Sequence, residues 1–424
     1  MYFAAILLAG TLGAPADTLP VPWRLADLLA AVEAISPELA AAKAEQLAAE
    51  ARVGPVSRLA DPRIQFGLMN RSLPGFGKRS PLAMDQIQLM QMVPVPGKLA
   101  AATARARAEA RVTAASGAQR RSAVRLRAAA EFFELDRVDR SVASLHRNGL
   151  LLREIEGVVR AMYSVGSGAQ SSVLRAQIEL ARLEEELIGM RAMRAGIAMR
   201  INSLLLRPDD VPVAAVLPPC LPESLPPTAV LVDAALRGGP GPAPARERVA
   251  AAEAGRRVAS LERWPDFELG VAYGRQPMIG EPGTDHMLSL MVGTSIPLWA
   301  GSRQGAMRRE TAALASAAQA DLRAVEADTR ARIGELVADY QRTRRLRELY
   351  RGTILPQARG AASSSLAAYR TGGVGFEAVL EAQLALSRYD LQVIQLEAEQ
   401  ARTVAELEAL TALALMPANS GVVP

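Results

Sequence analysis

The chain has 424 residues, of which 50% are apolar but only 4% aromatic, and it carries a formal net charge of +5. The apolar residues are largely Ala, Leu and Val, which suits long, closely packed helices better than globular cores. The positive charge comes from arginines interleaved with Glu and Asp, a pattern typical of a solvated helix face rather than of a nucleic-acid-binding surface.

The sequence lacks the residue sets that enzyme active sites require. It contains two histidines, one cysteine (Cys220), no P-loop and no G-x-S-x-G motif. Nucleophilic, metal-hydrolytic and phosphoryl-transfer sites would therefore each miss a required group. We predict that the protein is not an enzyme and that it needs no cofactor.

Residues 1–16 are predicted to be a signal peptide, because Tyr2 to Leu12 is apolar and uncharged and the small-residue sequence Ala-Pro-Ala follows at 14–16. No later stretch approaches the roughly 20 uncharged apolar residues of a membrane helix. If the protein spans a membrane, we expect it to do so with strands.

The first predicted repeat covers residues 17–207. A helix runs from Pro37 to about Arg52, and period-two alternation then predicts a β-hairpin at 64–95. A helical hairpin at 97–206 follows: a long helix without an interior proline, a Tyr-x-x-Gly turn and a return helix with a heptad seam. At 1.5 Å per residue, such a long helix would reach about 100 Å.

The second predicted repeat, residues 245–416, has the same order. A proline-rich connector at 208–244 precedes it, and we leave open whether this connector forms short helices or a loop. A helix, a β-hairpin at 267–298 and a helical hairpin at 301–416 follow, in which Pro356 should kink or interrupt the long helix. Residues 417–424 are predicted to be a disordered tail.

The two repeats share residues as well as order. The pattern Y-x-x-G followed by VL-x-AQ-x-x-L-x-R begins at Tyr163 and recurs 206 residues later at Tyr369, whereas Gly67 recurs as Gly270 after 203 residues. A repeat of about half the chain is far longer than a solenoid unit. The three-residue difference predicts helical hairpins of unequal length or curvature.

Four strands cannot bury their own edges, and each unpaired backbone group in a bilayer costs several kcal/mol. A barrel needs about eight strands or more. Two copies of the chain would supply 8 strands and three would supply 12, and only the larger barrel leaves a comfortable lumen.

The ordered set of features resembles the TolC family of outer-membrane efflux proteins. The set comprises the signal peptide, the duplicated halves, the paired hairpins, the segment P-V-P-G-K at 94–98 and Y-x-x-G before VL-x-AQ. The resemblance implies an α+β membrane protein, a homotrimer with a 12-stranded outer-membrane β-barrel and a periplasmic α-barrel. It also implies two partners: a periplasmic adaptor protein and an inner-membrane pump.

Within this family, P-V-P-G-K most resembles the branch that works with heavy-metal resistance-nodulation-division pumps, which implies copper and silver or cobalt, zinc and cadmium as cargo. Drug efflux and type I protein secretion remain open. A soluble coiled-coil scaffold is the alternative of another class, because the heptads alone would support it. The hairpins and their flanking tryptophans disfavour the scaffold.

The resemblance places the two Tyr-x-x-Gly turns at the periplasmic tip, where the adaptor docks; the residues are Tyr163, Gly166, Gly168, Tyr369, Gly372 and Gly373. Turn geometry alone would also require glycines there. Arg370, Glu377 and Glu381 beside the second turn are candidate gate residues. Acidic residues at a helix N-terminus are equally favoured by the helix dipole.

Five methionines share a strand face with glutamine or serine and are predicted to face the lumen: Met69, Met90, Met92, Met287 and Met291. Thioethers are soft ligands that suit Cu(I) and, by analogy, silver, although no firm metal site is predicted. The alternative is that methionine fills a narrow barrel. Trp264 and Trp299 flank the second hairpin and suit the periplasmic membrane interface, with packing beneath the barrel as the alternative.

Overall fold

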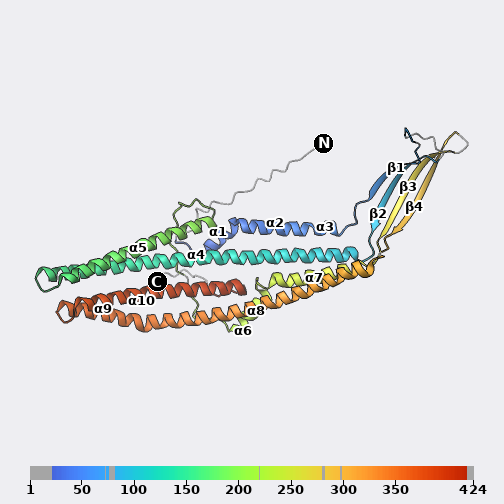
Figure 1. Cartoon of the computed structure of the whole chain (residues 1–424). Helices are drawn as coiled ribbons and strands as arrows, with labels where there is room; N and C mark the ends of the chain where they lie inside the picture. The colour runs from blue at the N-terminus through green and yellow to red at the C-terminus, as the bar shows by residue number, and fades with distance from the viewer. Residues whose placement is uncertain are drawn as a thin grey trace. The chain divides into compact units, whose positions relative to one another are not determined.

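A computed structural model of the chain describes residues 22–71, 73–75, 82–218, 220–278, 282–296 and 298–417 (Figure 1). The predicted signal peptide and residues 418–424 of the predicted tail lie outside this range. The elements are α1 Leu25–Ile35, α2 Pro37–Ala51, α3 Val53–Val56, β1 Arg63–Met69, β2 Met84–Val93, α4 Lys98–Ser164, α5 Gln170–Leu204, α6 Thr228–Gly238, α7 Ala243–Leu261, β3 Phe267–Pro277, β4 Thr284–Thr294, π-helix η2 Ala300–Gln304, α8 Gly305–Leu349, π-helix η3 Tyr350–Ile354, α9 Leu355–Arg370 and α10 Phe376–Thr411.

The chain divides into two compact units, each of which draws on both predicted repeats. One unit comprises the described residues of Met1–Ala41, Ala118–Gly241 and Glu326–Pro424, and the other those of Ala42–Gly117 and Pro242–Val325. The first contains only helices and connecting segments. The second contains the sheet and the helical segments that adjoin it. No helix in the described ranges is both long enough and apolar enough to cross a membrane.

The helical unit has its largest core where the first repeat meets α10. Phe132, Phe133 and Leu135 of α4 are almost fully buried together with Ile197 of α5 and Ala401 of α10. Alanine-rich segments suit this arrangement because small side chains let helices approach closely and have high helix propensity. This core fixes α10 against the first repeat within one chain.

The N-terminal part of this unit contains a helix that the sequence patterns did not predict. In α1, Leu28 and Val32 are buried in the core. Trp23 just before it donates its backbone N–H to the carbonyl of Ala215, 3.0 Å away, and so pairs with the connector. The connector itself contains the helix α6, and its Pro222 carbonyl accepts a 2.7 Å hydrogen bond from the hydroxyl of Tyr340. The connector is therefore partly helical and packed.

The long helix of the second repeat is interrupted beside Pro356, as expected. The interruption takes the form of the π-helix η3, which ends just before Pro356 in the first turn of α9. Proline lacks a backbone N–H, so a regular α-helix would leave one carbonyl unpaired there. A π-turn holds more residues than an α-turn. Both π-helices, η2 and η3, lie in the second repeat. Between its hairpin and its tip turn this repeat is three residues longer than the first, and the π-helices accommodate part of that difference.

The sheet has the order β1-β2-β3-β4 with antiparallel neighbours throughout (Figure 1). The pairing of β2 with β3 joins the two repeats, with Leu89 opposite Val271 and Met90 opposite Gly270. The strands β1 and β4 each have one neighbour in this sheet, so both present an open edge.

Lys98 joins α4 to the start of β3 and gives P-V-P-G-K a structural role. Its ammonium lies 2.9 Å from the Trp264 carbonyl and 2.9 Å from a carboxylate oxygen of Asp266. The same carboxylate accepts a hydrogen bond from the backbone N–H of Val95. Gly97 supplies the left-handed backbone, with a φ of +100°, that turns β2 into α4. The motif thus connects strand and helix across the two repeats.

Candidate functional site

The two faces of the sheet differ in chemistry. The register aligns an apolar set on one face: Ile64, Phe66, Ile87, Leu89, Leu269, Val271, Leu288, Leu290 and Val292. These side chains are open to the surroundings, with Phe66 80% and Leu290 79% exposed. A band of exposed apolar residues on alternating strand positions is the pattern of a lipid-facing surface.

The opposite face, which we call the methionine face, carries polar residues and thioethers. The register aligns on it Gln65, Met69, Met84, Gln86, Gln88, Met90, Met92, Met287, Ser289 and Met291. The five methionines singled out from the sequence thus share one face. Met84 joins them and was missed. Its alternation with Gln86 is the signal that could have found it.

Glycines in β3 make room for these methionines. A Cβ on Gly270 would lie 3.3 Å from the Met291 methyl carbon, and a Cβ on Gly274 would lie 2.7 Å from the Met84 sulfur. The amide of Gln88 donates toward the Met291 sulfur, which is 3.8 Å away. The thioethers therefore lie against bare β3 backbone, with an amide beside one of them.

Harder metal ligands do not gather in the part of the chain that the structure describes. It holds no group of three or more His, Cys, Asp and Glu side chains arranged to bind a metal ion. On the methionine face, amides and a hydroxyl lie near the sulfurs, and one carboxylate, that of Glu268, is paired opposite Met92. Such a surface offers weak, soft contacts rather than a closed coordination site.

The two turns of the predicted tip have the same backbone. In the first, Ser167 N–H donates to the Met162 carbonyl at 3.0 Å and Gly166 N–H to the Tyr163 carbonyl at 3.0 Å. Gly373 and Gly372 repeat both bonds in the second turn, at 2.8 and 3.1 Å. This is the Schellman motif, and both Gly166 and Gly372 have the left-handed φ of +77° that it requires.

The tips differ in what surrounds them. Tyr369 is 7% exposed and its ring centroid lies 6.2 Å from that of Phe376, whereas Tyr163 is 45% exposed. The residue equivalent to Phe376 in the first repeat is Gln170, so the first turn has no aromatic partner. Burial raises the pKa of the Tyr369 hydroxyl. Gly168 fits closely under its own turn, since a Cβ there would lie 3.0 Å from the Tyr163 nitrogen.

The candidate gate residues are not joined to one another. Glu377 accepts a 2.5 Å hydrogen bond from Arg175 of α5, a partner that the sequence did not suggest. Arg370 and Glu381 are exposed, and neither forms an ion pair within the described residues. The ion pair at this end of the hairpins thus links the first and second repeats.

The tryptophans at the base of the sheet are both open. Trp264 is 49% exposed, and the guanidinium carbon of Arg263 lies 5.2 Å from its ring centroid. Trp299 is 72% exposed. Tryptophan and arginine pairs of this kind suit the boundary between lipid and water.

One face of α5 lacks the cover that its counterpart in α10 has. Leu380 shares a buried cluster with Leu152 of α4, and Ala405 shares another with Phe132, so the first repeat covers α10. The equivalent side chains of α5 are exposed, and we call them the α5 face. The three pairs, with the exposed fractions of the α5 and α10 members, are Leu174 and Leu380 (52% and 8%), Ile188 and Ile394 (61% and 7%), and Met199 and Ala405 (52% and 7%).

A half-buried charge network between α4 and α10 escaped sequence analysis, because alternating Arg and Glu resemble a solvated surface. Arg140 donates to Glu397 at 2.6 Å and approaches Asp136 at 3.5 Å, while Arg351 pairs with Glu397 from η3. Burial raises the pKa of Asp136 against the opposing effect of Arg140. In Glu134, burial raises the pKa, but hydrogen bonds and charge from Arg137 and Arg402 outweigh it and leave the pKa lowered.

Several solved structures share the fold of this chain over nearly their full lengths. OprN, an outer-membrane channel, matches with a TM-score of 0.78 at 18% identity, covering 93% of this chain and 91% of its own. VceC, an outer membrane protein from Vibrio cholerae, matches at 0.75 and 17%, covering 92% and 96%. CusC, described by its transmembrane channel formation, matches at 0.75 and 13%, covering 95% of each chain. At these identities the likeness establishes the fold.

Residues 231–413 match the sequence model of the outer membrane efflux protein family. This matched segment spans less than half of the chain, and over it the chain is similar to outer membrane efflux proteins. The resemblance drawn from the motifs is thereby confirmed, as are the outer-membrane location and the absence of an enzymatic role. No curated protein matches the sequence. The family match and the solved channel structures together support an outer-membrane efflux channel.

Proposed function

We propose that three copies of this chain close into one outer-membrane duct that passively conducts heavy-metal cations, foremost copper and silver, delivered by an inner-membrane pump through a periplasmic adaptor. The observation that carries the assembly is the α5 face. Its counterpart in α10 is buried by the same chain, so a face of the same design is left for a neighbouring chain to cover.

The sheet supports the same assembly. Its open edges at β1 and β4 each need a partner strand in a membrane, because unpaired backbone groups there cost several kcal/mol. Pairing β4 of one copy with β1 of the next satisfies both edges by one repeated contact. Four strands per chain give 12 in a cyclic trimer, a number that leaves a lumen lined by the methionine face.

The tips are the proposed docking sites for the adaptor. Tyr163, Gly166 and Gly168 in the first turn, with Tyr369, Gly372 and Gly373 in the second, offer two turns of one backbone design. An adaptor that recognises backbone shape would meet similar surfaces six times around a trimer. Arg370, Glu377 and Glu381 remain candidates for charged contacts that hold the tip closed.

Conductance tests the channel. Purified protein reconstituted in planar lipid bilayers should give stepwise currents, with an opening frequency that rises when Arg370 is replaced by Ala if this residue helps to close the tip. Recovery as a soluble protein that gives no current would contradict the channel and favour the coiled-coil scaffold. Unchanged closure of the Arg370→Ala channel would remove the gate role alone.

The methionine face carries the cargo proposal, because sulfur ligands suit Cu(I) and silver. In a host that depends on this duct and its pump, replacing Met90, Met92, Met287 and Met291 with Leu should increase copper and silver sensitivity. Zinc and cobalt tolerance should stay unchanged, since these ions prefer other ligands.

A control variant changes four methionines outside the sheet to Leu: Met162, Met190, Met193 and Met307. Matched expression in the outer membrane must be verified for both variants. Equal copper tolerance of the two variants would leave methionine as filler and return drug efflux and protein secretion to consideration. Loss of drug tolerance together with metal tolerance would indicate a general defect of the channel.

A further inference from the structure

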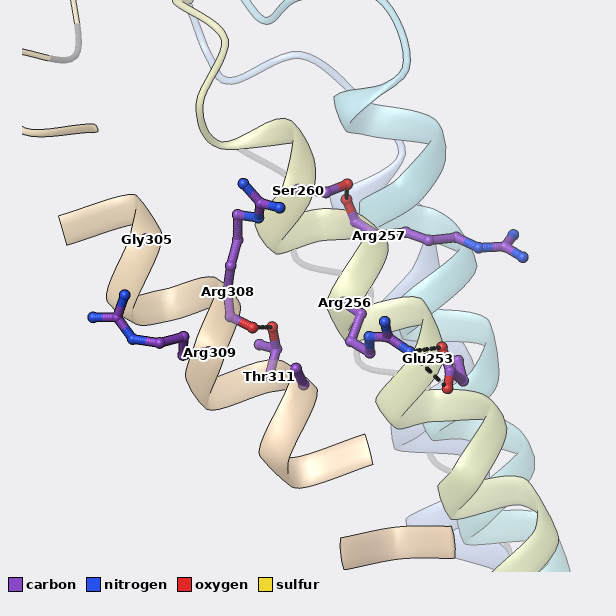
Figure 2. A pocket seen from close by; sticks show the side chains of 9 residues that line it. Glu253, Arg256, Arg257, Ser260, Gly305, Arg308, Arg309 and Thr311 are labelled. Carbon is purple, nitrogen blue, oxygen red and sulfur yellow. Dashed lines mark hydrogen bonds and ion pairs between the residues drawn. The ribbon is translucent and has the colours of Figure 1, made fainter. Parts of the chain in front are cut away.

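A basic groove lies between α7 and the first turns of α8 in the unit that contains the sheet (Figure 2). Its volume is about 610 Å³. The lining residues are Glu253, Arg256, Arg257, Ser260, Arg308 and Arg309, with Gly305, Thr311 and Ala312. The side chains and backbone of four arginines thus surround a space that contains one carboxylate.

Only one of these arginines is neutralised. Arg256 pairs with Glu253 at 3.0 Å. Within the described part of the chain, Arg257, Arg308 and Arg309 have neither an ion pair nor a side-chain hydrogen bond. Figure 2 shows the guanidinium of Arg308 between the two helices, extended toward Ser260, while Arg257 points away from the other labelled side chains and Arg309 extends on the side of α8 that faces away from α7. Arg308 and Arg309 are therefore the free cations on the α8 side.

Both cations reach toward the sheet end of α8. The nearer guanidinium nitrogen of Arg309 would lie 3.8 Å from a Cβ on Gly305, one helical turn closer to η2 and β4. Long basic side chains extend in this way when an apolar layer and its polar boundary lie at one end of a helix.

Aromatic residues mark that boundary in the same unit. Trp264 follows α7 and Trp299 precedes η2, and both are exposed. At a rise of 1.5 Å per residue, the backbone of Arg308 lies about 14 Å along the helix axis from Trp299. The long side chain of Arg308 brings its guanidinium closer. The carboxylates next to Trp264 do not compete with an anionic ligand for the arginines, because Glu262 and Asp266 both pair with Lys98.

We propose that this arginine groove binds the phosphate of an anionic phospholipid in the membrane leaflet that faces α7 and α8. The inference rests on the proposed function, which sets the sheet in the outer membrane. Guanidinium groups match phosphate oxygens through paired hydrogen bonds, and uncompensated arginines near a membrane surface attract anionic lipids. Free phosphate shares this chemistry, so the two sources need separate measurements.

The test uses the purified, assembled protein in neutral detergent and follows its melting temperature. Short-chain phosphatidylglycerol should raise the melting temperature, whereas phosphatidylcholine should not. In the variant R308Q/R309Q, the phosphatidylglycerol concentration for half of the effect should rise roughly fivefold per arginine removed. Inorganic phosphate should have no effect at lipid concentrations.

Arg323→Gln is the matched control, because Arg323 is exposed on the same helix but outside the groove. It should respond to phosphatidylglycerol as the wild type does. An equal lipid response in R308Q/R309Q would overturn the site, and an equal effect of inorganic phosphate would overturn the lipid assignment. Conductance of both variants in neutral lipid separates this outcome from failure of the channel itself, which would abolish current in the wild type too.

Discussion

The helices α5 and α10 show how one sequence pattern serves two environments. Both follow a tip turn of the same backbone and carry the same motif 206 residues apart. In α10 the first repeat of the same chain covers the apolar face, whereas in α5 the equivalent face stays exposed. Duplication thus produced one internal interface and one external surface that only another chain can cover.

The largest expected effect comes from breaking the α5 face. Ile188→Glu should prevent assembly, because the interface between chains would then bury an unpaired carboxylate. The free energy of that burial is far larger than the stabilisation that exposed ion pairs provide. We expect the heat-sensitive, detergent-resistant oligomer band in outer-membrane extracts to disappear.

The control is Glu186→Lys, two residues away, whose counterpart Gln392 is exposed in the second repeat as well. This variant should assemble normally. If Ile188→Glu assembled as well as the control, the α5 face would not be an interface between chains.

A pair of alanine substitutions compares the two faces directly. Leu380→Ala should lower the free energy of unfolding by about 2–3 kcal/mol, since Leu380 is buried within the chain. Leu174→Ala should change the stability of dissociated subunits by less than about 0.5 kcal/mol, and should instead speed exchange of subunits between labelled oligomers. Denaturant titration gives the first quantity and fluorescence energy transfer the second; equal losses in both assays would erase the distinction.

The charge network that holds α10 against α4 allows a smaller and pH-dependent test. Glu397→Gln should lower the free energy of unfolding by about 1–2 kcal/mol, less than the loss of a fully buried pair, because the partners Arg140 and Arg351 reach solvent.

The raised pKa of Asp136 means that the fold favours the protonated form of this residue. Its contribution to stability is therefore present at low pH and is lost as pH rises through the pKa in the folded state.

Asp136→Asn should therefore be more stable than the wild type at pH 7, with a difference that shrinks toward pH 4. Parallel melting curves across this range measure the effect. A difference that grows on acidification would show that pairing with Arg140, rather than burial, dominates at Asp136.

The smallest effect concerns the tips, where the two repeats agree. Gly166→Ala and Gly372→Ala should each cost about 1 kcal/mol, because both place a Cβ on a left-handed residue. Gly360→Ala within α9 is the control and should stabilise by about 0.5–1 kcal/mol, as nothing lies within 4 Å of its Cβ. Clearly unequal costs at 166 and 372 would show that the surroundings, not the turn, decide the energy.

Local patterns predicted much of this fold. Alternation placed the strands, the lack of prolines placed α4, and Tyr-x-x-Gly placed both turns, since each signal depends on backbone chemistry within a few residues. The α1 helix was missed because it is short and follows the segment interpreted as a signal peptide. The burial of Leu380 but not of Leu174 could not be predicted. Both return helices carry the same heptad pattern, and long-range packing decides which of them is covered by the same chain.

The candidate sites divide in the same way. Parity along the strands grouped Met90, Met92 and Met291 on one face without any structure, and would have added Met84. The pairing of Glu377 with Arg175 needed the distance between two repeats. The arginine groove needed the antiparallel packing of α7 and α8, because Arg256 and Arg308 are far apart in sequence.

Native mass spectrometry of the protein extracted from the outer membrane shows whether the chain closes with copies of itself. We expect a single complex with the mass of three chains, stable until heated. A complex of one or two chains that nevertheless conducts ions would contradict it.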